Sequence, residues 1–245
     1  MNHTDVSVHI FAFYQDTGKY LLDRVSKIYN GNSIYLSLVN GNHANDTLIE
    51  TARKYFDVKI IYVDNSGTDQ YGFYHSFKYD NLDTNWIFYC HDKHISKIDW
   101  LNDMMDTFDN IDKGLLDNKK NGMLASKKHE AKIQSFDDLL ELENTVDIKY
   151  RKALVESMHT LIWYLQLQRI LFIKQELSSK EDKFTNFSAG NIFLIRRDVV
   201  EKAHACIYEN FFNKGVYRSD GEVGHGIERF YFYVSKCMGY ENVFK

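Results

Sequence analysis

Proline is absent from this chain and cysteine is scarce. The missing proline, together with abundant Asn, Lys, Tyr and Ile, indicates an AT-rich coding sequence and carries no information on mechanism. The cysteines Cys90, Cys206 and Cys237 are odd in number and lack the spacing of a metal site. We interpret them as free thiols in a reducing compartment.

The chain also lacks an export signal and a long hydrophobic run. Residues 1–5 are polar and precede only a short apolar stretch, unlike a signal peptide. The longest apolar stretch, residues 161–173, is interrupted by Gln166, Gln168 and Arg169 and is too short to span a bilayer. We therefore expect a protein of the cytoplasm, or of the host cytoplasm if the source is viral. Any contact with a membrane would be peripheral.

Positive charge is not in excess. The formal net charge is −4, which argues against a dedicated nucleic-acid-binding protein. At 44% hydrophobic and 15% aromatic residues, the chain can bury a full core, which argues against disorder. Because the 245 residues show neither a repeat nor a linker, we predict a single domain.

The first half alternates strand patterns with helix patterns. Residues 17–29, for example, place Tyr20, Leu21, Val25 and Ile28 at helical spacing. This rhythm predicts an α/β fold with a Rossmann-like, mostly parallel central sheet flanked by helices and a helical C-terminal portion. The expected strands cover residues 6–14, 33–39, 59–63, 85–89, 123–125 and 189–195. The expected helices cover residues 17–29, 46–55, 69–77, 98–108, 137–142, 150–177 and 198–212, and a last one runs from 224 or 226 to 238.

A polar turn follows the expected strand at 59–63. Gly67 permits a positive φ, and Asn65 and Asp69 offer polar side chains beside backbone N–H groups. Asp69 is also a candidate N-cap. The turn has neither the dinucleotide fingerprint nor the Walker glycine pattern. It is either part of a ligand crevice at the carboxyl edge of the sheet or a capped strand–helix turn.

The next expected strand ends in His91, Asp92, Lys93 and His94. An acidic residue such as Asp92 at a strand end is a natural ligand for a hard cation that bridges phosphates. Lys93 can neutralise phosphate charge directly. Cys90 and the two histidines provide too few ligands for zinc. The alternative is a solvated polar loop.

Two further segments carry candidate site residues. The first segment leads into an expected buried strand and contains Ser188, Gly190 and Asn191. Small residues at this place let a ligand approach the backbone closely. Packing explains the glycine equally well.

In the last segment, His225, Glu228 and Arg229 share one face of a helix by their spacing. Glu228 can act as a base or bind a hydroxyl, and Arg229 can clamp an anion. The alternative is an internal Glu–Arg pair. Three glycines favour a mobile loop that closes on a ligand, namely Gly221, Gly224 and Gly226.

In this order, the four segments resemble the rhamnan-synthesis-F-like group of glycosyltransferases over residues 6–240. That group shows an Asn-x-Gly-x-Asp turn, a His- and Lys-containing strand end, a small-Gly-x-x-Phe-x-x-Arg segment and a His-x-x-Glu-Arg segment. The chain departs from the group at Thr68, where Arg is usual, and at Asp92, where Thr is usual. It also has no clear Asp-x-Asp motif, which leaves metal dependence open.

The resemblance implies a GT-A-like enzyme that moves a sugar from a nucleotide-sugar donor to a glycan acceptor. Its nucleotide-sugar half would cover about residues 1–125 and its acceptor half about 126–245. From the clusters at the expected strand ends, we predict Glu228 and Asp92 as the catalytic residues. The predicted donor-binding residues are Tyr14, Asn65, Gly67, Asp69, Lys93 and Arg229. The predicted substrate-binding residues are His91, Ser188, Gly190 and Asn191. Asp92 and His225 would bind a divalent cation, Mn²⁺ or Mg²⁺, if the enzyme uses one.

Two other functions remain open at this stage. A non-catalytic carbohydrate-binding protein on the same scaffold would use the aromatic residues as sugar platforms. A metal-dependent phosphoester hydrolase would use Asp92 and the histidines.

Overall fold

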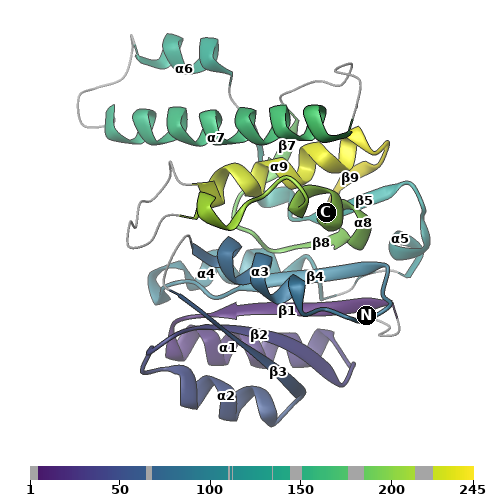
Figure 1. Cartoon of the computed structure of the whole chain (residues 1–245). Coiled ribbons are helices and arrows are strands. Elements are labelled where there is room, and N and C mark those ends of the chain that lie inside the picture. Colours follow the sequence, from purple (N-terminus) through teal and green to yellow (C-terminus); the bar gives the residue numbers. More distant parts are fainter. Residues whose placement is uncertain are drawn as a thin grey trace.

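Figure 1 shows the computed structural model of the chain. The structure describes residues 5–64, 68–109, 111, 113–133, 135–143, 151–175, 185–212 and 223–245.

A seven-stranded sheet forms the centre, in the order β3-β2-β1-β4-β8-β5-β9 (Figure 1). The neighbouring strands pair in parallel, except that β8 is antiparallel to both β4 and β5. The strands are β1 (Val6–Ala12), β2 (Ser33–Val39), β3 (Asp57–Val63), β4 (Trp86–His91), β5 (Asn121–Ala125), β8 (Phe193–Arg196) and β9 (Glu241–Phe244). The predicted α/β fold with a mostly parallel sheet is confirmed.

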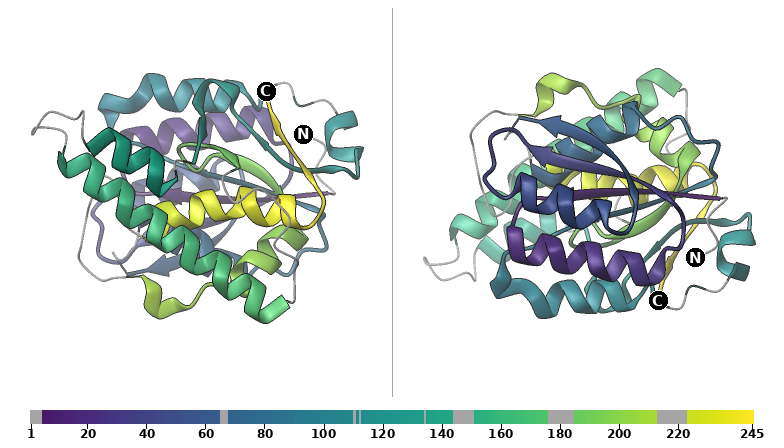
Figure 2. Two further views of the ribbon diagram at one scale, coloured as in Figure 1. Left: turned by 90° about the horizontal axis from the view of Figure 1, so that it is seen from above. Right: turned by 90° about the horizontal axis from the view of Figure 1, so that it is seen from below.

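Helices cover both faces of this sheet, as buried parallel strands require. The strand β1 shows the division, because Val8 and Ile10 pack on one face while Phe11 packs on the other. Figure 2 shows the sheet between a layer that contains α1 and α4 and a layer that contains α9. The first layer consists of α1 (Gln15–Ile28), α2 (Asn45–Arg53) and α4 (Ile98–Asp106). The second contains α3 (Thr68–Lys78), α8 (Arg197–His204) and α9 (Val223–Cys237).

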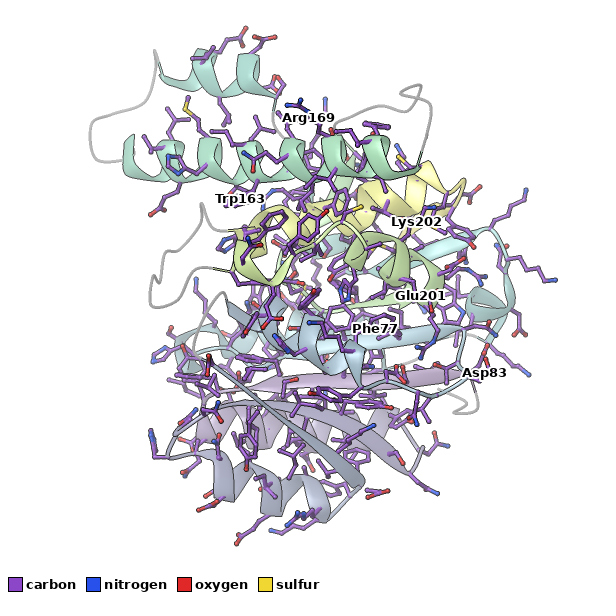
Figure 3. All side chains as sticks on the ribbon, in the orientation of Figure 1. Phe77, Asp83, Trp163, Arg169, Glu201 and Lys202 are labelled. Carbon is purple, nitrogen blue, oxygen red and sulfur yellow. The ribbon has the colours of Figure 1, made fainter. Side chains whose placement is uncertain are left out.

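The long helix α7 (Arg151–Gln175) packs on α9. Trp163 lies on the side of α7 that faces α9 (Figure 3). A Cβ at Gly226 would come within 2.8 Å of Trp163 Cβ, so the glycine allows the two helices to approach closely. Gly224 and Gly226 are buried within α9, so the prediction of a mobile loop is wrong for both. Gly221 lies outside the described residues.

Smaller elements complete the described chain. The strands β6 (Glu130–Lys132) and β7 (Asn186–Ser188) form a separate antiparallel pair. The helix α6 (Phe136–Glu143) packs on α7, and α5 (Lys113–Asp117) precedes β5. Short 3₁₀ turns cover Ile95–Lys97, Lys127–His129 and Glu209–Phe211.

The predicted boundaries were wrong in the last third of the chain. The expected strand 189–195 overlaps only β8, because residues 189–192 lie between β7 and β8, where the backbone reverses through Gly190 with φ +119° and Asn191 with φ 57°. The expected helix 198–212 ends at His204 and gives way to turns and a 3₁₀ segment. The strands β6, β7 and β9 and the helix α5 were not predicted, since each is short. Among the described helices, none combines the length and the apolar character needed to cross a bilayer.

A buried polar network connects α3 and α8 to the N-terminal half of β1. His9 Nε2 lies 2.9 Å from Asp80 Oδ2, and His9 Nδ1 lies 2.8 Å from Ser76 Oγ. Ser7 Oγ and Arg197 Nη2 donate to the same Asp80 oxygen at 2.8 Å and 2.7 Å. Although Ser76, His9 and Asp80 are connected as in a hydrolytic triad, the side chains of all three are buried, so the cluster is structural.

Candidate functional site

The candidate site lies where the strand order turns back. From β1, the chain builds outward to β2 and β3 on one side and then crosses to β4 on the other. The carboxyl ends of β1 and β4 are neighbours, since Phe11 pairs with His91. Ligands of open α/β sheets bind at such a point.

Asp92 joins the ends of these two strands. Its Oδ2 accepts hydrogen bonds from the backbone N–H of Phe13 at 3.0 Å and of Tyr14 at 2.6 Å. Tyr14 is the N-cap of α1, so the carboxylate fixes the start of this helix against β4. Asp92 is only 3% exposed, and burial raises its pKa to about 7, although the two amides act in the opposite direction.

The turn between β7 and β8 approaches the same edge of the sheet. Its Gly190 and Asn191 amides both donate to Glu228 Oε1 on α9, the second at 3.1 Å. His91 Nε2 at the end of β4 lies 2.8 Å from the Gly190 carbonyl oxygen. An ideal Cβ at Gly190 would lie 1.8 Å from the Trp100 ring, so this position requires glycine. Three of the predicted motifs therefore meet at one turn.

His91 is a neutral donor in this arrangement. Burial lowers its pKa to about 4, and the Gly190 carbonyl, which can only accept, places the proton on Nε2. Asp69 Oδ2 lies 3.6 Å from the same nitrogen. Tyr89 donates its hydroxyl to the Asp69 carbonyl oxygen at 2.8 Å, which holds the first turn of α3 over β4. Asp69 is inside α3, one residue after its start, and not at the N-cap as predicted.

Lys93 lies among several carboxylates. Its Nζ is 4.7 Å from the centre of the Trp100 ring. Burial lowers the pKa of Lys93, while Asp69, Glu228 and Asp92 oppose that change through their charges. Burial also raises the pKa of Glu228, against the charges of neighbouring cations. The site thus holds one ammonium group close to three acidic side chains.

The end of the site towards α7 is formed by α9. Arg229 Nη1 donates to the His225 carbonyl oxygen at 2.7 Å and lies 3.8 Å from Glu228 Oε2. The guanidinium carbon of Arg229 stacks 4.5 Å from the centre of the Phe187 ring. The predicted helix through His225, Glu228 and Arg229 is confirmed, and Glu228 and Arg229 lie close together within it.

The structure brings His91, Gly190, Asn191 and Glu228 into direct contact, with Asp69 beside them. Other predicted residues lie at its margins. Tyr14 is 38% exposed, with its ring 5.5 Å from His94. Ser188 is buried and donates its hydroxyl to the Ser126 carbonyl oxygen at 3.2 Å, so it acts in packing. Asn65 and Gly67 lie outside the described residues.

Sequence reasoning missed Trp100 and Tyr89. Trp100 lies in α4, a helix that was expected, but helical spacing alone does not indicate its contact with Gly190 and Lys93. Tyr89 precedes the polar strand end, and its apolar neighbours predict only a residue of a buried strand. Its hydroxyl group, near the end of that strand, is the one feature of the sequence that could have indicated a hydrogen bond there.

The predicted cation site has no independent support in this geometry. In the part of the chain that the structure describes, no three His, Cys, Asp or Glu side chains are arranged to hold a metal ion. Asp92 already uses its carboxylate for backbone amides. Binding of Mn²⁺ or Mg²⁺ by Asp92 and His225 stays a prediction.

The sheet order defines an α/β protein, and the polar cluster at its reversal is the candidate ligand site at the carboxyl edge of the sheet. The chain belongs to the family Rhamnan synthesis protein F, whose profile matches residues 1–240. The predicted family is confirmed, and with it a role in polysaccharide synthesis. A comparison with curated proteins gave no match.

Proposed function

We propose that this protein is a glycosyltransferase with a GT-A-like fold, which moves a sugar from a nucleotide-sugar donor to a glycan hydroxyl. One observation carries the proposal: His91, Gly190 and Glu228, from three separate elements, are joined by hydrogen bonds where the strand order reverses. Membership of a polysaccharide-synthesis family supports it. The cytoplasmic location and the division into donor and acceptor halves stay predictions.

The donor would lie across the ends of β1 and β4. Lys93 is the cation that faces the developing diphosphate charge, and neutralising that charge is the main requirement for loss of a nucleoside diphosphate. Tyr14 and His94 provide an exposed aromatic edge beside the start of α1, suited to a nucleobase.

Asp92 and Glu228 act by positioning in this proposal. Asp92 fixes the start of α1, and Glu228 fixes the turn at Gly190, each through two backbone amides. Glu228 Oε1 already accepts two amide hydrogens and is poorly placed to remove a proton from an acceptor hydroxyl, while Oε2 lies 3.8 Å from Arg229 Nη1. The geometry therefore favours positioning over the predicted role of Glu228 as a base.

A thermal-shift screen with UDP, GDP, TDP and CDP, each with and without Mn²⁺, tests the proposal. A nucleotide at about 100 times its Kd should stabilise the fold by about 2.7 kcal/mol, which moves the Tm by a few degrees. Lys93→Ala should weaken that binding at least about tenfold, because a charge-assisted contact is lost. Lys119→Ala removes an exposed lysine elsewhere and should leave it unchanged.

Other outcomes would point to the alternatives. A flat response to all four nucleotides, with binding to a glycan array, would replace the proposal by the carbohydrate-binding function. Metal-dependent hydrolysis of a generic phosphoester without any acceptor would replace it by the hydrolase.

A further inference from the structure

A cavity lined in part by Phe187 and Arg229 adjoins the candidate site on the side of α7. It has a volume of about 420 Å³, within the range of small-molecule sites. Residues from β6, α6, α7, β7 and α9 surround it. Its described lining residues are Ala131, Lys132, Ile133, Leu139, Ser157, Leu161, Phe187 and Arg229.

The lining of this cavity is apolar with cationic ends. Ile133, Leu139 and Leu161 form apolar walls, and the Phe187 ring carries the Arg229 guanidinium on its face. Lys132 is exposed at the rim. The described lining residues include two cations and no carboxylate. Glu228 Oε2, outside the lining, lies 3.8 Å from Arg229 Nη1, and Asp138 interacts with Lys132 through its charge, so an anionic group in the cavity would share these cations with the two carboxylates. The lining suits such a group when it is attached to a body with apolar faces. A sugar ring has such faces, and an aromatic ring beside it is a suitable platform.

The cavity is connected to the site by two chain segments. Phe187 lies in β7 immediately before the turn that holds Gly190, and Arg229 follows Glu228 in α9. A molecule seated in the cavity would therefore contact the same turn that His91 and Glu228 hold.

We propose that this cavity binds the acceptor, and that it selects a glycan with an anionic substituent, a phosphate or a carboxylate, held by Lys132 and Arg229. The proposal rests on the proposed function, since it names the acceptor class of the same site. It also assigns Arg229 to the acceptor in place of the predicted contact with the donor. Guanidinium and ammonium groups bind phosphate and carboxylate through charge-assisted hydrogen bonds.

The test compares three probes with the same ring, glucose 6-phosphate, glucuronate and glucose, by isothermal titration calorimetry. The wild type should bind at least one anionic sugar about tenfold more tightly than glucose. Which anion binds separates a phosphorylated acceptor from a uronic-acid acceptor. Equal affinity for all three sugars, including no binding of any, would overturn the proposal.

Two variants locate the binding in the cavity. Lys132→Glu reverses one charge at an exposed position and should remove the preference for the anionic sugar. Ser157→Phe fills the cavity without changing its charge and should weaken every sugar that binds there. Lys119→Glu makes the same charge change at an exposed position outside the lining and should bind like the wild type. Unchanged sugar binding in Lys132→Glu and Ser157→Phe would also overturn the proposal.

Nucleotide binding separates this proposal from the previous one. If Lys132→Glu loses the anionic sugar while UDP or another diphosphate still shifts the Tm, both proposals stand. If the anionic sugar binds in the cavity but no nucleotide binds, the anion site stands and the glycosyltransferase function falls.

Discussion

The carboxylate of Glu228 accepts a hydrogen bond from the backbone N–H of Gly190, 38 positions earlier in the chain. This bond fixes a turn in which position 190 requires glycine. The same turn receives His91 from the opposite side. The candidate site is therefore held together by backbone groups of one turn as much as by its ionisable side chains.

Gly190→Ala should destabilise the fold by about 3 kcal/mol or more, measured by urea unfolding. The added Cβ would overlap the Trp100 ring, and φ +119° is unfavourable for alanine. Gly41→Ala is the matched control, since Gly41 also has a positive φ, +72°, but nothing lies within 4 Å of its Cβ position. It should cost only about 1 to 2 kcal/mol. Equal costs would show that the Trp100 contact has no energetic role.

Glu228 distinguishes positioning from base catalysis. Glu228→Gln keeps a carbonyl oxygen for the two amides, so it should retain most of the stability and, if the residue only positions the turn, most of the turnover. Loss of a general base would instead reduce turnover by about 100-fold or more. Steady-state kinetics on an established donor and acceptor decide between the two.

Glu228→Ala should lower the free energy of unfolding by about 3 kcal/mol, because it leaves the buried Asn191 amide and the half-buried Gly190 amide without an acceptor. Glu201→Ala on α8 changes an exposed glutamate (Figure 3) and should stay within about 0.5 kcal/mol of the wild type.

His91 should make the fold sensitive to acid. Its folded pKa of about 4 lies below the unfolded value of about 6.5, so the unfolded state binds the proton first as the pH falls. Its contribution to stability is complete above about pH 6.5 and is lost progressively down to pH 4, by up to about 3 kcal/mol. The difference in unfolding free energy between wild type and His91→Gln should therefore change over this range, and a constant difference would contradict the assignment.

Asp92 acts in the opposite direction over the same range, which is why the difference is the useful quantity. Its folded pKa of about 7 is raised, so protonation as the pH falls from 7 to 4 favours the folded state. The pH dependence of the wild-type unfolding free energy alone would combine the effects of His91 and Asp92.

Asp80→Ala should destabilise the fold by about 3 kcal/mol at pH 7, because it leaves Arg197 and His9 facing each other without the shared acceptor. Burial opposes the ionised form of Asp80, but the bonds from His9 and Ser7 lower its pKa well below the usual range. The stabilisation is thus complete above about pH 4 and is lost as the pH falls further. Chemical unfolding at pH 7 and pH 3 should show a smaller difference from wild type at the lower pH.

An exposed acidic residue provides the control for Asp80. Asp23 forms a surface pair with Lys27 at 2.6 Å, and Asp23→Ala should cost less than about 1 kcal/mol. If both substitutions cost the same, the buried network does not stabilise the fold.

The parallel strands β1 to β4 could be predicted because each has a local signal in the sequence. The buried run of β1 and the helical spacing of α1 are local signals, and their alternation is enough to indicate parallel pairing. The order and the chemistry of the four motifs also indicated the family, which the profile match over residues 1–240 confirms.

The roles of the individual site residues could not be predicted from local sequence patterns. Nothing local to Glu228 shows that its partners are amides at 190 and 191, because that contact depends on how α9 packs against α7 and the sheet. The sequence does not indicate the reversal at Gly190, because the apolar residues within 189–195 predict one continuous strand. Gly226 was interpreted as flexible, although its neighbours on α7 make it a packing position.

The antiparallel strand β8 has a consequence for the order of assembly. It pairs Trp86 with Arg196, so the centre of the sheet joins segments that are far apart along the chain. During synthesis, β1 to β4 can pair as soon as they emerge, but the strand end at His91 gains its partner only when the turn at Gly190 arrives, and that turn is held only once α9 has formed. The candidate site at this edge is therefore completed last, and its complete geometry requires that nearly the whole chain has folded.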